Sequence, residues 1–454
     1  MSYQTAVEHL YALGHELANT SSHKFDLAHM RTLLGELGHS ERKFPSVLIA
    51  GTNGKGSTAA TLASILRVSG LRTGLYTSPH LLRINERIRI NGVEISDYEF
   101  ATLYEAVDRA AERLLKANAL PWHPSFFEMM TAIAFEHFAQ HQVEIAVLEV
   151  GMGGRLDATN VVEPCVSVIT DIALDHQKFL GDTVAEIARE KAGIIRRGGV
   201  VVTLPQQPQA NDVIGNTILD LDAKGVSAVP YVPPVSPASA EFLVQRTNEK
   251  KSGAHCISRY PLHVMGQQIT VETPLVGRHQ LRNIALAIAA AEELSKQGFA
   301  VTPEAIERGI RETRWPGRFQ VVLSHGTEPE YVFDAAHNPA GAWALRSTLS
   351  ACYEDRRVIF VFGAMKDKAI GEMAEILFPL AERVIATHAD NPRAATPQEI
   401  REAASRTSTT IEDAEDVAAA LARVRSLAGP EGVVVITGSI YIVGEAMRIL
   451  GVKA

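Results

Sequence analysis

Short apolar runs rich in β-branched residues alternate along the chain with longer segments whose apolar positions recur at helical spacing. In the first part of the chain, the short runs predict strands at 46–50, 73–76, 144–150 and 166–170. The longer segments predict helices at 57–68, 96–117, 124–140, 183–194, 278–297 and 303–313. Strands and helices that alternate in this way build a mostly parallel sheet with helices on both faces. The pattern therefore predicts an α/β fold.

Two stretches depart from this pattern. Over 205–277 the helical periodicity weakens. Within this stretch a loop is marked by Pro233, Pro234 and Pro237, and alternation over 262–271 predicts antiparallel strands. Any role of the stretch beyond packing stays open. Trp315-Pro-Gly317 then interrupts the chain, and a new set of elements follows. Strands are predicted at 331–334, 358–362, 383–387 and 433–437, and helices at 339–352, 397–406, 413–427 and 441–450. We therefore predict a large domain over 1–314 and a smaller, Rossmann-like α/β domain over 315–454.

The composition narrows the possible functions. The 454 residues are 46% hydrophobic, enough for a large core, and the net charge of −8 argues against general nucleic-acid binding. The three cysteines, Cys165, Cys256 and Cys352, share no metal-ligand spacing. No apolar run approaches the roughly 18 residues of a membrane span, and the N-terminal sequence lacks a signal-peptide layout. We expect a cytoplasmic, monomeric enzyme with no nucleic-acid or membrane partner.

A glycine-rich loop, Gly51-Thr-Asn-Gly54-Lys55-Gly56-Ser57-Thr58, lies between a predicted strand and a predicted helix. Glycines let backbone N–H groups point inward, the start of a helix adds positive potential, and Lys55 can reach terminal phosphates. The loop departs from the common GxxxxGK[ST] spacing, because two residues separate Gly51 from Gly54 and Gly56 follows the lysine. By itself it predicts ATP or GTP binding, and a glycine-rich turn with a solvated lysine is the structural alternative.

The loop variant GTNGKGS resembles the Mur-ligase superfamily of ATP-dependent amide-forming enzymes, and its GKGS form resembles the folylpolyglutamate synthase and dihydrofolate synthase branch. Further motifs follow in the order of that family. They are Ser78-Pro-His80, Asn85-Glu-Arg87, the run from Glu149 to Asn160, Asp175-His176, Glu190-Lys191, His279-Gln280, the run from Trp315 to Arg318 and the run from Asp334 to Asn338. The resemblance implies a ligase that adds L-glutamate to a reduced folate, and also to dihydropteroate, at the expense of ATP. In that reaction the substrate carboxylate becomes an acyl phosphate, which the glutamate amine attacks.

Magnesium is expected at such a site, because a triphosphate and a carboxylate bring several negative charges together. Ser78 and Glu149 lie at the ends of two predicted strands, and His176 follows a third. The carboxyl ends of parallel strands face the ligand crevice of an open sheet. The resemblance implies that these three residues bind Mg²⁺, as two ions. Histidine is an unusual ligand for this hard ion. The structural alternatives are a turn serine, a glutamate paired with an arginine and a hydrogen-bonded loop histidine.

Lys191 lies in the predicted helix 183–194, where physical reasoning alone favours a solvated lysine. The resemblance instead implies a carbamylated lysine, a carboxylate-like group that helps to organise metal and nucleotide. The residues with an implied catalytic role are then Lys55, Glu149, His176 and Lys191.

The resemblance also implies the ATP contacts. They are Asn53, Gly54, Lys55, Gly56, Ser57, Asn283, Arg318, Asp334 and His337. Asn283 is assigned to the adenine end and Asp334 to the ribose, while the Arg318 guanidinium can donate to phosphates after domain closure. An interdomain salt bridge is the alternative for Arg318, and a helix N-cap is the alternative for Asp334.

A pterin fits the substrate side. The segment Ser125-Phe126-Phe127-Glu128 resembles the family segment that lines the pterin pocket, where aromatic rings can stack on the pterin. Asp157 resembles a residue tied to pterin binding in bifunctional members of the family. Phe126 and Phe127 as core residues, and Asp157 as a turn residue, are the alternatives. For the glutamate substrate, a helix that starts at Ser439 is a candidate carboxylate site, with an N-cap as the alternative. Met365-Lys-Asp-Lys368 is a second candidate.

Two other functions stay open. A Mur-type ligase could act on another carboxylate, such as a peptidoglycan precursor, but the 45 residues before the first strand are too few for a sugar-nucleotide domain. A P-loop switch without ligase activity would bind or hydrolyse nucleotide regardless of glutamate and folate. The motifs at Glu149, His176 and Lys191 count against it.

Overall fold

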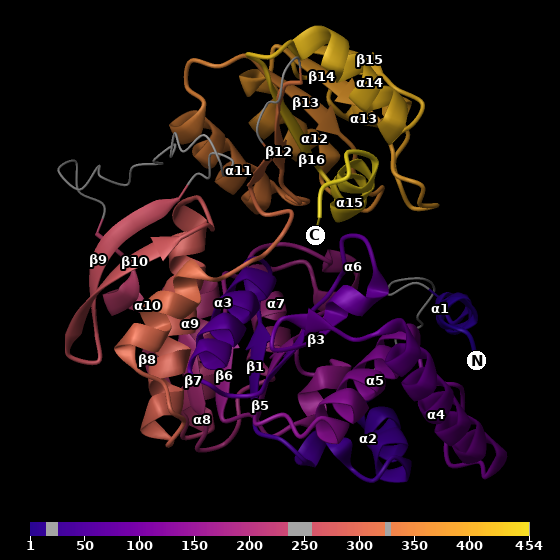
Figure 1. Ribbon diagram of the computed structural model, residues 1–454, viewed down its shortest axis with the longest axis vertical. Helices are drawn as coiled ribbons and strands as arrows, with labels where there is room; N and C mark the ends of the chain where they lie inside the picture. The colour runs from indigo at the N-terminus through magenta and orange to yellow at the C-terminus, as the bar shows by residue number, and fades with distance from the viewer. Residues whose placement is uncertain (15–25, 235–256, 323–327, 454) are drawn as a thin grey trace. The chain divides into compact units, whose positions relative to one another are not determined.

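The computed structural model describes residues 1–14, 26–234, 257–322 and 328–453. Pro237 and Cys256 lie outside these ranges. The described chain forms two compact units (Figure 1). The first unit contains Met1–Pro233, Leu262–Ile269 and Arg282–Glu312, and the second contains Pro234–Pro261, Thr270–Leu281 and Thr313–Ala454.

The first unit is built on an eight-stranded sheet. The strand order is β4 (Val93–Glu94), β3 (Ile88–Ile90), β2 (Thr73–Tyr76), β5 (Ile145–Glu149), β1 (Ser46–Ala50), β6 (Val166–Ile169), β7 (Val200–Thr203) and β8 (Lys224–Ser227). Neighbours pair in parallel except at β2–β3 and β3–β4. The predicted mostly parallel sheet is therefore confirmed.

Strand β1 fixes where the glycine-rich loop begins. All five of its residues are buried, as expected for a strand covered on both faces. Its Ile49 lies opposite Glu149 of β5, and its Ala50 lies opposite Ile169 of β6. The loop that follows Ala50 therefore starts between the carboxyl ends of two neighbouring strands.

Helices cover both faces of this sheet (Figure 1). Leu48 and Ala50 of β1 share one apolar core with α4 and α5, whereas α3 packs against β1, β2 and β5 together with α10. The helices of this part of the chain are α1 (Tyr3–Ala12), α2 (Leu27–Glu36), α3 (Lys55–Val68), α4 (Asp97–Lys116), α5 (Phe126–Gln140), α6 (Gln177–Leu180), α7 (Val184–Ala192), α8 (Pro208–Asp220), α9 (Arg278–Lys296) and α10 (Pro303–Arg311).

The stretch where the periodicity weakens contains more regular structure than expected. Helix α8 and strand β8 lie in its first part. In its second part, β9 (Ser258–Val264) pairs with β10 (Gln267–Thr273), and the two-residue turn Met265-Gly266 joins them. Buried and exposed residues alternate along β9. Because a two-residue connection can join only antiparallel neighbours, the predicted antiparallel strands are confirmed.

The second unit contains a six-stranded sheet. The order is β11 (Gln320–Val322), β12 (Glu330–Phe333), β16 (Val433–Thr437), β13 (Val358–Phe362), β14 (Arg383–Ala386) and β15 (Thr410–Asp413). Only β11 runs antiparallel to its neighbour. The helices are α11 (Pro339–Cys352), α12 (Ile370–Leu377), α13 (Pro397–Ala403), α14 (Val417–Ala428) and α15 (Ile440–Ile449). This arrangement confirms the predicted second α/β fold.

One predicted helix begins too early. Residues 410–413 form the edge strand β15, and α14 begins only at Val417, where the Asp416 side chain accepts a hydrogen bond from the Ala419 N–H. The prediction of a helix from 413 is therefore wrong at its start.

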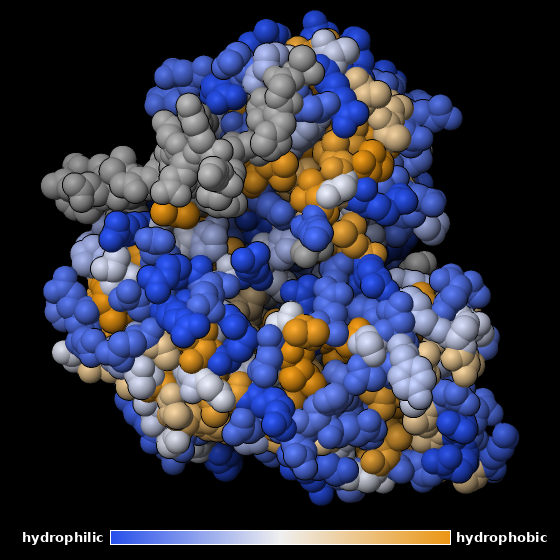
Figure 2. Space-filling view, in the orientation of Figure 1, coloured by the Kyte–Doolittle hydropathy of each residue, from blue (hydrophilic) through white to orange (hydrophobic). Residues whose placement is uncertain are grey.

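No helix in the described ranges is long and apolar enough to cross a membrane. Figure 2 shows hydrophilic side chains over most of one face, with hydrophobic ones in smaller groups.

Candidate active site

The glycine-rich loop connects β1 to α3, which begins at Lys55. The backbone N–H groups of Thr52 and Asn53 donate to the Asp171 carbonyl at 2.9 and 3.1 Å, which ties the loop to the end of β6. Gly54 has a φ of +90° and caps the start of α3. A Cβ at Gly54 would lie 2.1 Å from Oδ1 of Asn283, so this position needs glycine for its conformation and for the close approach.

Two lysines bond to neighbouring carbonyl groups of this loop. Lys55 Nζ donates to the Thr52 carbonyl at 3.2 Å, and Lys191 Nζ donates to the Gly51 carbonyl at 2.7 Å. Lys191 is buried, so the interpretation of a solvated helix lysine is wrong. Burial, and then the nearby charge of Lys55, lower the pKa of Lys191 to about 7, against the opposing effect of Asp175. A substantial fraction of this amine is therefore neutral near pH 7.

Ser78 and Glu149 meet at the ends of two paired strands. Glu149 is the last residue of β5, and the Ser78 N–H donates to its Oε2 at 3.1 Å. Glu149 is almost fully buried, with 4% of the residue exposed. Carboxylate and hydroxyl oxygens are the donors that Mg²⁺ prefers, so the donor chemistry of this pair fits the ion.

His176 lies at the start of the short helix α6, with a φ of +52°. Its backbone N–H donates to Oδ1 of Asp175 at 2.9 Å, and its ring Nε2 lies 3.9 Å from the other oxygen of that carboxylate. Asp175 is also one of the charges that act on Lys191. The segment thus places the Asp175 carboxylate, which His176 follows, in the surroundings of the buried lysine.

Asp157 organises the loop after β5. Its carboxylate accepts hydrogen bonds from the Met152 N–H at 3.0 Å and from the N–H and hydroxyl of Thr159 at 3.0 and 2.5 Å. Burial raises the pKa of Asp157, against the lowering effect of these donors. It also contributes to the charge around Lys191. In the described structure, Asp157 is therefore a buried cap residue as well as a candidate for pterin binding.

Ser125 and Glu128 form a capping box at the start of α5. The Ser125 hydroxyl accepts from the Glu128 N–H at 3.3 Å, while Oε2 of Glu128 accepts from the Ser125 N–H at 2.8 Å. Oε1 of Glu128 bonds to Nδ1 of His29 at 2.8 Å. The Ser-x-x-Glu spacing is a known helix-start signal, which sequence analysis passed over here.

The two phenylalanines that follow have different surroundings. Phe126 is buried, stacks on Tyr11 with ring centres 5.6 Å apart, and lies under the Arg87 guanidinium at 5.3 Å. Phe127 is half-buried and contacts Tyr76 at 6.1 Å. Phe126 is therefore held in the core, whereas Phe127 keeps some exposed surface.

His80 belongs to the same group of side chains as Phe126. Its Nδ1 accepts from Nε of Arg87 at 2.9 Å, and its Nε2 lies 3.2 Å from the Tyr11 hydroxyl. Burial, and then the Arg87 charge, hold the pKa of His80 well below its usual range. The imidazole is thus neutral, and the contact fixes the orientation of the arginine above the Phe126 ring.

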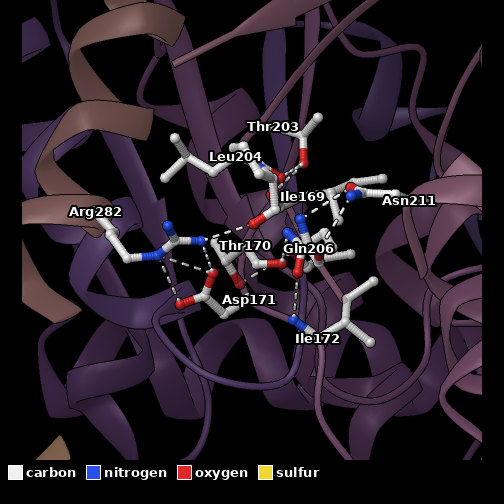
Figure 3. A network of polar contacts seen from close by, with 11 residues as sticks. Ile169, Thr170, Asp171, Ile172, Thr203, Leu204, Gln206, Asn211 and Arg282 are labelled. Carbon is white, nitrogen blue, oxygen red and sulfur yellow. Dashed lines mark hydrogen bonds and ion pairs between the residues drawn. The ribbon is translucent and has the colours of Figure 1, made fainter. Parts of the chain in front are cut away.

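Arg282 and Asp171 form a bidentate ion pair beside the loop (Figure 3). Nη2 and Nε of Arg282 donate to the Asp171 carboxylate at 2.6 and 3.2 Å. Gln206 stabilises the segment that follows β6, because its side chain donates to the Thr170 carbonyl and accepts from the Ile172 N–H. Sequence analysis missed this pair, and no local pattern joins residues 111 positions apart.

Asn283 follows Arg282 in α9 and contacts the glycine-rich loop directly. The Thr58 hydroxyl donates to its carbonyl at 3.4 Å, and its side-chain amide lies against Gly54. Among the predicted ATP contacts of the first unit, the structure therefore brings Asn283 together with Gly54.

The second unit brings together three of the predicted ATP contacts. Asp334, at the end of β12, accepts from the backbone N–H groups of Phe319 and Ala336, both at 2.9 Å. Burial raises its pKa, against the lowering effect of Arg318 and His337. Helix α11 is capped by Asn338 instead, so the N-cap alternative for Asp334 is wrong.

The predicted glutamate contacts also lie in the second unit. Ser439 is buried and caps α15, where its hydroxyl accepts from the Tyr441 N–H at 3.2 Å. The N-cap interpretation therefore describes its observed contact, and glutamate binding stays a prediction. Lys366, in the second candidate segment, pairs with Glu399 at 3.6 Å.

The fold and this arrangement are those of a Mur-type ligase. The Mur ligase middle domain model matches residues 127–291, and the Mur ligase glutamate ligase domain model matches residues 317–440. Among relatives, the Bacillus subtilis dihydrofolate synthase/folylpolyglutamate synthase is 36% identical, over 93% of this chain and 94% of its own. The Lacticaseibacillus casei folylpolyglutamate synthase is 34% identical, over 99% of both.

A solved structure agrees with these relatives. The Mycobacterium tuberculosis folylpolyglutamate synthase, in complexes with ADP and AMPPCP, superimposes with a TM-score of 0.82 at 31% identity, over 99% of both chains. The chain therefore belongs to the folylpolyglutamate synthase/dihydrofolate synthase family and is an ATP-dependent ligase. Neither a P-loop switch without ligase activity nor a Mur-type ligase for another carboxylate is favoured by these similarities.

Proposed function

We propose that this ligase adds L-glutamate to a reduced folate and also to dihydropteroate. The observation that carries the proposal is the pair of lysines bonded to the glycine-rich loop, beside a strand end that holds Glu149 against Ser78. The names of the relatives, which include both synthases, support the choice of substrates.

The loop and Lys55 bind the triphosphate of ATP. Lys55 exchanges its bond to the Thr52 carbonyl for phosphate oxygens, while the start of α3 adds positive potential. Asn53, Gly54, Gly56 and Ser57 complete the phosphate contacts, and Asn283 contacts the adenine end. In the second unit, Arg318, Asp334 and His337 stay predicted contacts of ATP.

Ser78, Glu149 and His176 are the proposed Mg²⁺ ligands. When bound, Mg²⁺ neutralises phosphate charge and polarises the transferred phosphoryl group. The protein contributes the rigidity of the donors, because Glu149 is buried and its Oε2 accepts from the Ser78 N–H. His176 is the ligand whose chemistry fits this ion least well.

Lys191 is the proposed site of carbamylation. The lone pair of the neutral amine attacks the carbon of CO₂, an N–C bond forms, and one amine proton leaves to solvent. The product is a carbamate with one negative charge in place of the ammonium. The lowered pKa of about 7 supports this reaction, since only the neutral amine is nucleophilic.

The chemical steps need no nucleophile from the protein. The substrate carboxylate attacks the γ-phosphorus of ATP, which gives an acyl phosphate and ADP. The glutamate amine then attacks the acyl carbon, loses a proton, and expels phosphate from the tetrahedral intermediate. The protein positions the reactants and stabilises developing charge.

The pterin side of the substrate is assigned to Ser125, Phe126, Phe127, Glu128 and Asp157. Phe127 is the strongest candidate for direct stacking, because it is half-buried and the ring of Tyr76 supports it. Its position is set by Phe126, which packs in the core, and by the capping box that Ser125 forms with Glu128 at the start of α5. Ser439 is the assigned contact for the glutamate carboxylate.

Glutamate-dependent release of ADP tests the substrate assignment. The purified protein is assayed with ATP and L-glutamate, with dihydropteroate in one sample and tetrahydrofolate in the other. Turnover with both is expected. Turnover with tetrahydrofolate alone would remove dihydropteroate from the proposal, and ATP binding without turnover in either sample would overturn it.

Isotope transfer tests the acyl phosphate. A substrate labelled with ¹⁸O in the reacting carboxylate should pass one label to the released phosphate, because that oxygen bridges carbon and phosphorus in the acyl phosphate. Phosphorus NMR of the product phosphate detects the label. Unlabelled phosphate from a labelled substrate would exclude this route.

A further inference from the structure

A group of two histidines and a glutamate lies at the contact of α4 and α5, apart from all residues assigned above. Glu99 belongs to the first turn of α4, and His137 and His141 lie one turn apart at the end of α5. One ligand atom of each residue can be chosen so that all three lie within 4.8 Å of one another. We propose that Glu99, His137 and His141 bind a divalent transition-metal ion of the Zn²⁺ class.

The spacing of the histidines suits such an ion. Residues i and i+4 of a helix lie on one face, and the rings of His137 and His141 have centres 4.5 Å apart. A pair of imidazoles and one carboxylate, with an open fourth position, is a common ligand set of tetrahedral Zn²⁺. Mg²⁺ and Ca²⁺ prefer oxygen ligands, so this donor set selects against both.

His137 is the most informative member of the group. Only 4% of His137 is exposed. Within the described ranges, its ring nitrogens make no hydrogen bond. His137 therefore places an imidazole beside that of His141 at the end of α5.

Glu99 is already oriented for this role. Its Oε2 is fixed by the capping box with Ser96, whose hydroxyl donates to it at 2.5 Å. Its Oε1 lies 2.9 Å from Nε2 of His141. A metal ion would take the place of the proton in that bond, while the Ser96 contact holds the carboxylate in position.

The backbone at the end of α5 is held as well. Arg72 donates from Nη1 to the His141 carbonyl at 3.0 Å, and its own N–H donates to Glu144 at 2.7 Å. Zn–N and Zn–O bonds of about 2.0–2.2 Å bring ligand atoms closer than the observed spread, so small side-chain shifts close the site. The ion then ties the start of α4 to the end of α5.

Cobalt and zinc titrations of the full chain test the proposal. After treatment with a chelator, the protein is titrated with Co²⁺ in excess Mg²⁺, which occupies the predicted magnesium site. The wild type is expected to bind one equivalent with the visible absorption of a tetrahedral ion, and Zn²⁺ is expected to displace it. The His141→Ala and Glu99→Gln variants should lose this equivalent and its absorption.

The His123→Ala variant is the matched control. His123 lies in the loop between α4 and α5, outside the group of three, and pairs with Asp108 at 3.1 Å. The variant should keep the full equivalent. Zn²⁺ should also raise the melting temperature of the wild type by a few degrees, and leave that of His141→Ala unchanged. Equal Co²⁺ binding by the wild type and His141→Ala, or no binding by either, would overturn the proposal.

Discussion

The Gly54 backbone lies against the side-chain amide of Asn283, so that a Cβ on Gly54 would come within 2.1 Å of Oδ1. This contact joins the start of α3 to α9 and sets the position of an adenine-contacting candidate relative to the phosphate loop. A Gly54→Ala substitution should therefore displace Asn283 and the loop together. We expect kcat/KM for ATP to fall by about 100-fold, the scale of a misplacement of about 1 Å caused by a mutation away from the reacting atoms.

The chain contains a matched control for Gly54→Ala. Gly70, after the other end of α3, has a φ of +89°, but a Cβ added there would have no atom within 4 Å. Both alanine variants carry the same left-handed strain of about 1–2 kcal/mol, visible in thermal unfolding. Only Gly54→Ala should lose ATP binding, measured by calorimetry. Equal kinetics for the two variants would mean that the Asn283 contact is irrelevant to ATP.

Lys191 provides a prediction that links charge to activity. Replacing Lys191 by Ala should lower turnover by at least about 100-fold, the scale of losing one preorganised electrostatic group. If the carbamate acts, wild-type activity should fall in CO₂-free buffer and return with bicarbonate, and ¹³CO₂ should give a carbamate signal in carbon NMR. The Lys116→Ala variant, whose side chain is 78% exposed on α4, is the control. Full activity of Lys191→Ala would exclude any role.

The lowered pKa of Lys191 also predicts how the free energy of unfolding changes with pH. In CO₂-free buffer its pKa is about 7 in the folded chain and about 10.5 when unfolded, so between these values the unfolded chain binds more protons. The free energy of unfolding of the wild type should therefore rise, relative to that of Lys191→Met, as the pH rises from 7 towards 10. Parallel curves from urea unfolding would contradict the burial of a free amine.

His29 and Glu128 should show the opposite trend. Burial lowers the pKa of His29, but the hydrogen bond and charge of Glu128 outweigh it, so the net pKa is raised. The extra stability is present below the unfolded pKa and is lost as the pH rises through the folded one. Relative to His29→Gln, the wild type should gain about 1–2 kcal/mol at pH 5.5, and less at pH 8, in urea unfolding. The exposed His9→Gln is the control, and a pH-independent difference would show that the pair carries no charge.

The sequence predicts best those strands that are covered by helices on both faces. Strand β1 is apolar at nearly every position because helices cover both faces of the sheet. The glycines that follow it indicate a turn from this strand into a helix. The edge strand β15 gives no such signal, because its residues are exposed or half-buried and three of the four are polar. The sequence therefore shows no clear boundary between this strand and the helix that follows. The helix predicted from residue 413 began too early because β15 shows little alternation between hydrophobic and polar residues, and not because distant contacts were needed.

The site shows the opposite limitation. Lys191 follows Arg189 and Glu190 in a charged run typical of a solvated helix face, and its burial depends on the Gly51 carbonyl 140 positions away. The Asp171–Arg282 pair has the same origin. Contacts of this kind arise only when the sheet brings strand ends together, so local patterns cannot predict them. The resemblance to a family supplies the predicted role of Lys191, and the fold supplies the burial that lowers its pKa.

The Asp171–Arg282 pair gives the last prediction. An Asp171→Asn substitution keeps the backbone carbonyl that bonds to Thr52 and Asn53, but weakens the bidentate hold on Arg282. Since Arg282 precedes Asn283, we expect the KM for ATP to rise by about 5- to 30-fold, the equivalent of 1–2 kcal/mol, with kcat nearly unchanged.

A second ion pair separates this effect from a general loss of charge. Glu163 pairs with Arg196 at 3.2 Å, and Arg196 keeps bonds to the Ile194 and Val162 carbonyls when Glu163 is replaced. Glu163→Gln should therefore leave the KM for ATP unchanged in the same steady-state assay. A fall in kcat with constant KM in Asp171→Asn would show that the pair acts on the chemical step, because a loosened nucleotide contact weakens binding first.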